Sequence, residues 1–328
     1  MNSAGRFTGV ILIAIGSASC GGDTDSIADT TTDSPADTDV ASPRVQVVLF
    51  THIEDQSPTG TLGSEPSRVS YLSLRSTLIE FAQLAAQDEV QWVLQPDWKI
   101  LEAARQYEDA ATMASTGGKN FLVYLRDDLG VVIDPHSHEN GGYNYTDVAY
   151  LLEVLGVGGT TVIGGHVWDP SLPEFAHWER FRDPQPGEKY PSALWRGDIL
   201  IGSGTPNHVN DPLVSGVWRP KEPNDYFTDD PQGNIVCVGA WHNDVAGVQE
   251  LVDLYAAGTV AATDMLTASW NITPAQIQAT NGPATIEQTV FLPLKEMESA
   301  GTIELTDFTT LVAAWQTRNS GRAYVYQP

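Results

Sequence analysis

The chain has 328 residues, of which 42 are Asp or Glu and 17 are Lys or Arg, and its formal net charge is −25. So acidic a chain repels polyanions, which excludes nucleic acid and an anionic membrane surface as expected partners. The roughly 285 residues after the N-terminal region suit one large α/β domain or two small ones.

Residues 1–19 have the three parts of a secretory signal peptide. Arg6 supplies a positive charge, residues 10–16 form a short apolar run, and small residues lead to Cys20. The run is too short to span a bilayer, which takes about 20 residues. A cysteine at this point resembles a bacterial lipoprotein signal, although Ser17 stands where Leu is usual. The resemblance implies a lipid on Cys20 and an exported, envelope-anchored protein; cleavage with an unmodified Cys20 is the alternative.

Residues 21–43 consist almost entirely of Asp, Thr, Ser, Ala and Gly. This segment has too little apolar surface to fold, so we expect an extended, disordered tether ahead of a folded domain at 44–328. With Cys20 lipidated, Cys237 is the only thiol left and no intrachain disulfide can form. Any metal would then be held by histidines and carboxylates.

Apolar strand patterns alternate with segments of helical period along the folded part. The expected strands are 45–50, 90–94, 131–133, 160–163, 199–201, a segment at Val217, and 235–238. The expected helices are 71–87, 100–108, 120–129 capped by Gly130, a helix from Thr146 or Asp147 to Leu155, 248–258, and a C-terminal helix from Thr306 or Asp307.

This alternation predicts an α/β fold with a parallel sheet of about six or seven strands, either a barrel or an open doubly wound sheet. In such folds ligands bind at the carboxyl ends of the strands. The polar clusters THIED, DPHSHEN and GGHVW each follow a strand. We therefore expect them to meet in space.

His136 and His138 give the sharpest chemical signal. Two imidazoles two residues apart on an extended segment point to the same side and can bind one ion. Asp134 and Glu139 flank them. A pair of ordinary loop histidines is the alternative.

The cluster that follows the first strand contains His52, Glu54 and Asp55. Adjacent carboxylates at a strand end can divide two roles, one ligating a metal and the other accepting a proton. His52 is a further candidate ligand. The alternative is a pair of acids in an ordinary turn.

Three more residues follow expected strands. His166 comes after two glycines that permit close approach and is a candidate ligand, with a structural role as the alternative. His242 is a candidate general acid, and Arg219 is a candidate for orienting a carboxylate or substrate. The many tryptophans suit stacking on sugar rings, although most are expected in the core.

The order of these clusters resembles the polysaccharide deacetylase family, which comprises metal-dependent carbohydrate esterases. VVLFTHIEDQSP resembles the family's first motif, and YLRDDLGVVIDPHSHEN resembles its second. WRP at 218–220 and the His of GAWHND resemble two later motifs. The likeness extends from residue 44 to about 258.

The resemblance implies a distorted (β/α)7 barrel of parallel strands that removes acetyl groups from a sugar polymer. Asp55, His136 and His138 would hold a divalent metal, zinc by expectation, with His52 or His166 completing the set. Glu54 would be the base, so Glu54→Gln would abolish turnover and leave the metal bound. Arg219 would position Glu54, and His242 would protonate the leaving amine.

Three departures from the family pattern bear on the reaction. The base would be Glu instead of Asp, the histidine spacing is HxH with Asn140 in place of the second His, and His52 is additional. His-x-Glu after a first strand is also similar to metal-dependent glycosidases, and HSH after a strand to phosphoesterases and amidohydrolases. A tethered, non-catalytic carbohydrate-binding protein is the third alternative.

Overall fold

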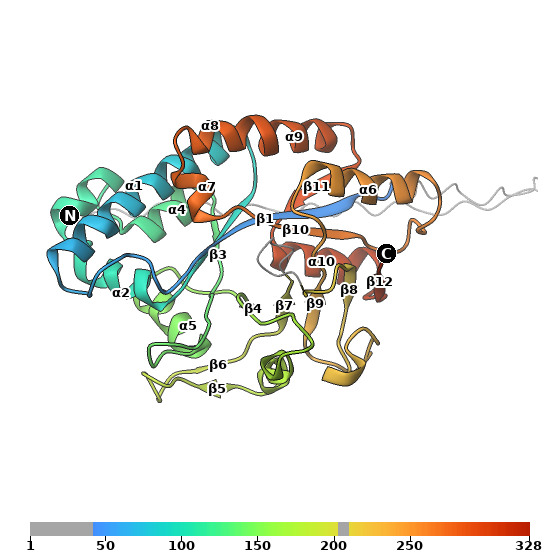
Figure 1. Ribbon diagram of the computed structural model, residues 1–328, viewed down its shortest axis with the longest axis horizontal. Coiled ribbons are helices and arrows are strands. Elements are labelled where there is room, and N and C mark those ends of the chain that lie inside the picture. Colours follow the sequence, from blue (N-terminus) through green and yellow to red (C-terminus); the bar gives the residue numbers. More distant parts are fainter. Residues whose placement is uncertain (1–41, 203–209) are drawn as a thin grey trace, which may run out of the picture. The chain divides into compact units, whose positions relative to one another are not determined.

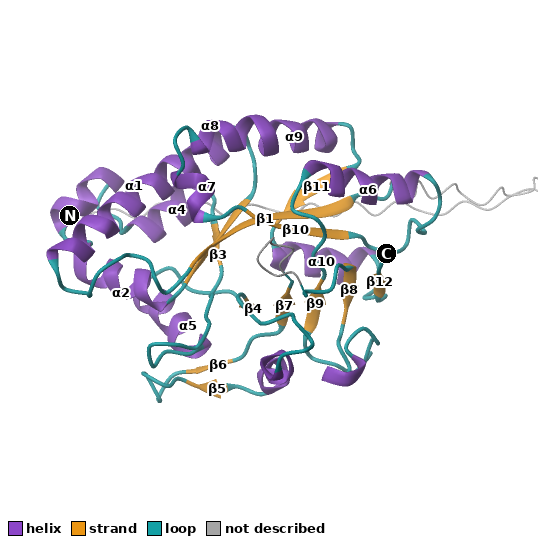
Figure 2. Ribbon diagram, in the orientation of Figure 1, coloured by secondary structure: helices purple, strands orange, loops and turns teal. Residues whose placement is uncertain are grey.

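The computed structural model describes residues 42–202 and 210–328. The expected signal peptide, Cys20 and nearly all of the tether lie outside the described residues. Figures 1 and 2 show strands at the centre of the described chain with helices around them.

The first sheet is built around β1 (Val45–Ile53), and all nine residues of this strand are buried. It pairs in parallel with β10 (Thr267–Asn271) on one edge. Its other edge pairs with β11 (Ile303–Thr306) at the start and with β2 (Trp92–Pro96) at the end, and β2 pairs with β3 (Val132–Ile133). Burial on both faces explains the continuous apolar run of β1.

The second sheet has the order β12-β8-β9-β7-β4. Strands β4 (Val162–Ile163), β7 (Ile199–Ile201) and β9 (Val236–Val238) are parallel. Strand β8 (Ser215–Trp218) runs antiparallel to β9, and β12 (Tyr324–Tyr326) runs antiparallel to β8. The hairpin β5 (Gln185–Pro186) and β6 (Leu194–Trp195) forms a separate pair.

The two sheets join at both sides. A parallel bridge between His136 and Gly164 continues β3 into β4. On the other side, the Thr267 hydroxyl of β10 bonds to the backbone of Gly216 in β8, and Ser215 Oγ bonds to the backbone of Thr267. The expected α/β barrel of parallel strands is confirmed, with one antiparallel strand, β8, in its wall.

The six expected helical segments are present, with most ends shifted by only a few residues, and the structure adds helices at 110–113, 274–278, 282–286 and 292–299 that were not expected. They are α1 (Glu65–Gln87), α2 (Trp98–Tyr107), α3 (Ala110–Met113), α4 (Phe121–Leu129), α5 (Tyr145–Val154), α6 (Val245–Ala256), α7 (Pro274–Gln278), α8 (Gly282–Ile286), α9 (Leu292–Ser299) and α10 (Phe308–Arg318), with short 3-10 or π segments at 114–116, 173–182, 223–225 and 287–291. Gly130 ends α4 with a positive φ, and Asp307 caps α10, as expected. Asn144, and not Thr146 or Asp147, caps α5, because Asp147 closes the capping box from its third position.

Inward-facing strand residues form a core that α10 covers. Val48, Phe50 and Val93 pack with Phe308 and Trp315 of α10 in one buried cluster. Since side chains alternate along a strand, the row that begins with Val48 and Phe50 continues at His52. The barrel interior is therefore apolar around Val48 and Phe50 and becomes polar at the carboxyl end of β1.

Among the described residues, none of the helices combines the length and the apolarity that crossing a membrane requires. Cys237 is a free, buried cysteine beside the Tyr226 hydroxyl, 3.2 Å away. Burial raises the pKa of its thiol.

Candidate metal centre

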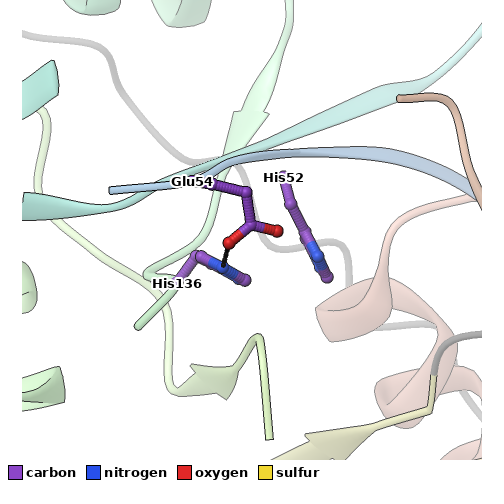
Figure 3. Close-up of side chains that lie close together, drawn as sticks. All are labelled: His52, Glu54 and His136. Carbon is purple, nitrogen blue, oxygen red and sulfur yellow. Dashed lines mark hydrogen bonds and ion pairs between the residues drawn. The ribbon is translucent and has the colours of Figure 1, made fainter. Parts of the chain in front are cut away.

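Glu54 lies just beyond β1 and faces two histidines that follow β3. Its Oε2 atom is 2.9 Å from His138 Nε2 and 3.3 Å from His136 Nε2. Figure 3 shows the side chains of Glu54 and His52 on the same side of β1, with Glu54 directed at His136. The predicted meeting of the first and second clusters is therefore present in the fold.

Three of these residues meet the distance requirement of a metal site. One ligand atom from each of His52, Glu54 and His136 lies within 4.8 Å of the other two. We call these residues the three-ligand cluster. His52 is 8% exposed and His136 is fully buried, whereas the Glu54 side chain is 36% exposed, so the site opens to solvent at Glu54.

The protonation states also suit a metal. Burial, followed by the neighbouring His136, lowers the pKa of His52 well below its usual value, which leaves a neutral imidazole. Burial alone would raise the pKa of Glu54, but hydrogen bonds to His136 and His138 hold it far below the usual range. Neutral imidazoles and an ionised carboxylate are the forms that bind Zn²⁺ and similar cations. The residues present thus fit a divalent cation.

Two glycines make room at the cluster, Gly165 for His136 and Gly164 for Gln95. A Cβ on Gly165 would lie 2.5 Å from Cε1 of the His136 ring, and a Cβ on Gly164 would lie 2.5 Å from Oε1 of Gln95. Gly165 also has φ +87°, which L-residues rarely adopt. Gly165 therefore lets the chain after β4 approach the His136 ring.

A buried polar pair lies behind His52. Gln95 is directly opposite His52 in the register of β1 and β2. The Gln95 amide donates to Asp134 at 3.2 Å, and the Thr160 hydroxyl donates to the same carboxylate at 2.5 Å. Burial raises the pKa of Asp134 to about 7. A side-chain hydrogen bond from Gln95 acts on His52 and partly offsets the lowering of its pKa, so Gln95 can orient the imidazole.

Asp97 is a site residue that the sequence analysis missed. It follows β2 directly, is fully buried, and its Oδ1 caps α2 by accepting from the Trp98 N–H at 2.5 Å. Burial raises its pKa to about 6, while the charges of His136 and His138 act in the opposite direction. A carboxylate directly after a buried strand was the available signal, the same one that identified Glu54.

Asp55 does not join the three-ligand cluster. It lies near enough for its charge to act on His138, whose pKa is raised mainly by the hydrogen bond to Glu54 and further by Asp97 and Asp55. The structure therefore brings Glu54, and not Asp55, to the position expected of the metal-ligating carboxylate. The expected assignment was the opposite, with Asp55 as the metal ligand and Glu54 as the base.

His166 is directed at a different part of the fold. Its ring lies 6.2 Å from that of Phe175, in the 3-10 segment 173–182. Burial, then the charge of Arg180, lowers its pKa to about 3. His166 thus packs beside Phe175 and Arg180, whereas its neighbour Gly165 contacts His136.

His242 lies in the loop after β9, a parallel strand, and is therefore at the same end of the barrel as the cluster. Its side chain is exposed and packs beside Trp241, with ring centroids 5.6 Å apart. Within the described residues it makes no hydrogen bond to the histidines or to Glu54.

Arg219 lies at the opposite end of the barrel, and the expectation that it positions Glu54 is wrong. Because β8 is antiparallel, its last residue adjoins the beginnings of β7 and β9. Arg219 pairs with both oxygens of Asp229 at 2.9 and 2.7 Å and stacks 5.0 Å over Trp315. It lines a cavity of about 630 Å³ with Ile199 and Val236.

Comparisons with known proteins give a fold and no family. No protein-family model matches the chain, and no curated protein matches it. A solved structure of a candidate glycoside hydrolase/deacetylase from Parabacteroides distasonis aligns with a TM-score of 0.51 at 10% identity, over 84% of this chain and 72% of that one. This likeness establishes a shared fold.

Two further solved structures align less closely. A 4-alpha-glucanotransferase from Thermococcus litoralis aligns with a TM-score of 0.48 and 10% identity. The alignment covers 87% of this chain and 42% of that protein's length. A candidate polysaccharide deacetylase from Pseudomonas aeruginosa aligns with a TM-score of 0.44 and 10% identity, over 84% of this chain and 91% of that one.

Proposed function

We propose that this protein is a metal-dependent hydrolase that removes acetyl groups from a sugar polymer. The observation that carries the proposal is the three-ligand cluster at the carboxyl ends of the parallel strands, where such barrels bind their ligands. The resemblance of its surrounding motifs to polysaccharide deacetylases, and the fold shared with a candidate glycoside hydrolase/deacetylase, support the substrate class.

In this proposal His52 and His136 would each supply an imidazole nitrogen, and Glu54 a carboxylate oxygen, to a divalent cation, zinc by donor type. The cation would supply Lewis-acid polarisation of the acyl carbonyl. His138 holds the Glu54 carboxylate by a hydrogen bond at 2.9 Å and, at 36% side-chain exposure, is the histidine that faces solvent. In this proposal Gly165 leaves the space that the His136 ring occupies, and the Gln95–Asp134 pair positions the ring of His52.

The test combines metal analysis with an activity assay. The purified protein is expected to hold one equivalent of divalent metal and to release acetate from acetylated glycans. Removal of the metal by a chelator should stop the release of acetate. Glu54→Gln should lose metal and activity together, because the carboxylate charge is removed. Glu304→Gln is the matched control, since Glu304 pairs with Arg318 on another surface. A Glu54→Gln variant that keeps its metal and rate would overturn the proposal.

A metal-dependent glycosidase is the second candidate. Glycoside hydrolysis uses two carboxylates beside the scissile bond, and both Asp55 and Asp97 act electrostatically on His138 beside the cluster. Release of new reducing ends without acetate would favour this reaction over deacetylation.

We also propose that the protein is exported and tethered through a lipid on Cys20. The motif of residues 1–20 supports this, and the acidic segment that follows would hold the domain off the surface. Fatty-acid labelling of the expressed protein should be present in wild type and absent in Cys20→Ser. Labelling that survives the substitution would exclude this anchor.

A further inference from the structure

The Asp97 carboxylate has one oxygen in use and one free. Oδ1 accepts from the Trp98 backbone N–H, while Oδ2 is buried and has no hydrogen-bond partner among residues 42–202 and 210–328. Asp97 as a whole is 0% exposed. Leaving a buried carboxylate oxygen unpaired is costly, so this oxygen is expected to meet a group that the described part of the chain does not supply.

Asp97 is held against the three-ligand cluster without belonging to it. Its backbone N–H donates to the Ile53 carbonyl at 3.0 Å, and Ile53 is the residue between His52 and Glu54. The charges of His136 and His138 act on its carboxylate. Its oxygens nevertheless lie outside the set of ligand atoms that meet within 4.8 Å.

Glu54 is not free for proton transfer in this arrangement. Its Oε2 already faces the Nε2 atoms of His136 and His138. Hydrolysis of an acyl group still needs a group that takes a proton from water and returns it to the leaving atom. Asp97 is a carboxylate beside the cluster with an oxygen that is both buried and unpaired.

We propose that Asp97 is the proton-transferring carboxylate of this site, a role that rests on the proposed hydrolase function. Its Oδ2 accepts a proton from water as the water oxygen bonds to the acetyl carbon. The same proton then passes to the leaving nitrogen or oxygen as the carbon–nitrogen or carbon–oxygen bond breaks. The products are acetic acid, which gives its proton to solvent to become acetate, and a free amine or hydroxyl on the sugar, and Asp97 is left ionised.

Asp97→Asn separates this role from the structural one. The Asn Oδ1 can still cap α2, because Asn and Asp cap helices about equally well, but Asn cannot accept the proton. The expected result is one equivalent of metal, unchanged folding, and a kcat about 10²- to 10⁴-fold lower. Asp109→Asn is the control, since Asp109 caps α3 by accepting from Thr112 N–H at 2.8 Å.

Four results would count against the role. A rate near wild type would show that Asp97 moves no proton, and loss of metal from Asp97→Asn would make Asp97 a ligand. A wild type that binds metal but releases no acetate would remove the proposed function and this role with it. Added formate should restore part of the rate of an Asp97→Ala variant, which a purely structural role would not permit; no gain in rate would count against proton transfer.

Discussion

The imidazole rings of His52 and His136 lie with their centroids 4.1 Å apart, inclined by 35°, although they come from different strand ends of the barrel. Two protonated imidazoles this close would repel each other, and both side chains are buried. Burial and the neighbouring His136 lower the pKa of His52, and a ring nitrogen of each histidine with one Glu54 oxygen can hold a cation between them. This pair is therefore the centre of the proposed metal site.

Gly165 should be essential for metal binding because its missing side chain makes room for His136. In Gly165→Ala, the new Cβ would lie 2.5 Å from the ring. We expect a loss of metal affinity of at least about tenfold, measured by calorimetric titration with Zn²⁺.

Gly158→Ala is the matched control for this change. Gly158 also has a positive φ, +69°, but its Cβ would meet nothing within 4 Å. Both variants carry the left-handed strain of about 1–2 kcal/mol, so only the clash differs. Equal metal affinities in the two variants would show that the approach to His136 has no importance.

Gln95 should hold His52 in its metal-binding orientation. Gln95→Leu removes the amide that is fixed by Asp134 and placed opposite His52. Outer groups of this kind are worth about 10- to 100-fold in metal affinity, and we expect a loss in that range by the same titration. Gln91→Leu, which removes an amide bonded to the Gly130 carbonyl, should bind metal as wild type does. An unchanged affinity for Gln95→Leu would exclude the positioning role.

The sequence was sufficient to predict which strand ends carry the chemistry, because apolar runs and the polar clusters after them are local features. His52, Glu54 and His136 were all identified in this way. The sequence did not predict that Glu54 takes the ligand position expected of Asp55. Which of two adjacent carboxylates faces the barrel depends on where β1 ends. β1 runs to Ile53, three residues beyond the expected strand.

The direction of β8 could not be predicted from the sequence pattern either. An apolar segment looks the same whether its strand is parallel or antiparallel, and only pairing with β9 and β12 fixes the direction. Arg219 was assigned to the wrong end of the barrel for this reason. Strands β10 and β11 were missed as well, and β10 closes the barrel through Thr267.

Arg219 should therefore matter for stability and not for turnover. Arg219→Ala removes a paired guanidinium that bonds to Asp229 and stacks on Trp315. We expect a loss of about 1–3 kcal/mol in the free energy of unfolding with kcat unchanged. Denaturant unfolding and an acetate-release assay give the two quantities. A large fall in kcat at unchanged stability would show that Arg219 takes part in turnover.

The buried Asp134 should make stability fall as the pH rises. Its folded pKa of about 7 is above the unfolded value of about 3.9. The folded state therefore retains a proton that the unfolded state has lost. The contribution is complete below about pH 4 and is lost as the pH rises through about 7.

Asp134→Asn isolates this contribution from the other titrating groups. Measured in EDTA, the free energy of unfolding of wild type should decrease more steeply between pH 5 and pH 8 than that of the variant, by an amount on the order of a few kcal/mol. Parallel pH profiles would show that Asp134 titrates normally in the folded protein.

The most direct measurement of the central claim is anomalous X-ray diffraction from crystals of the protein grown with Zn²⁺. A peak should appear at about 2.0–2.2 Å from a nitrogen of His52, a nitrogen of His136 and an oxygen of Glu54. It should disappear in crystals of Glu54→Gln. An empty cluster in zinc-soaked wild-type crystals, or a peak held by other residues, would contradict the account.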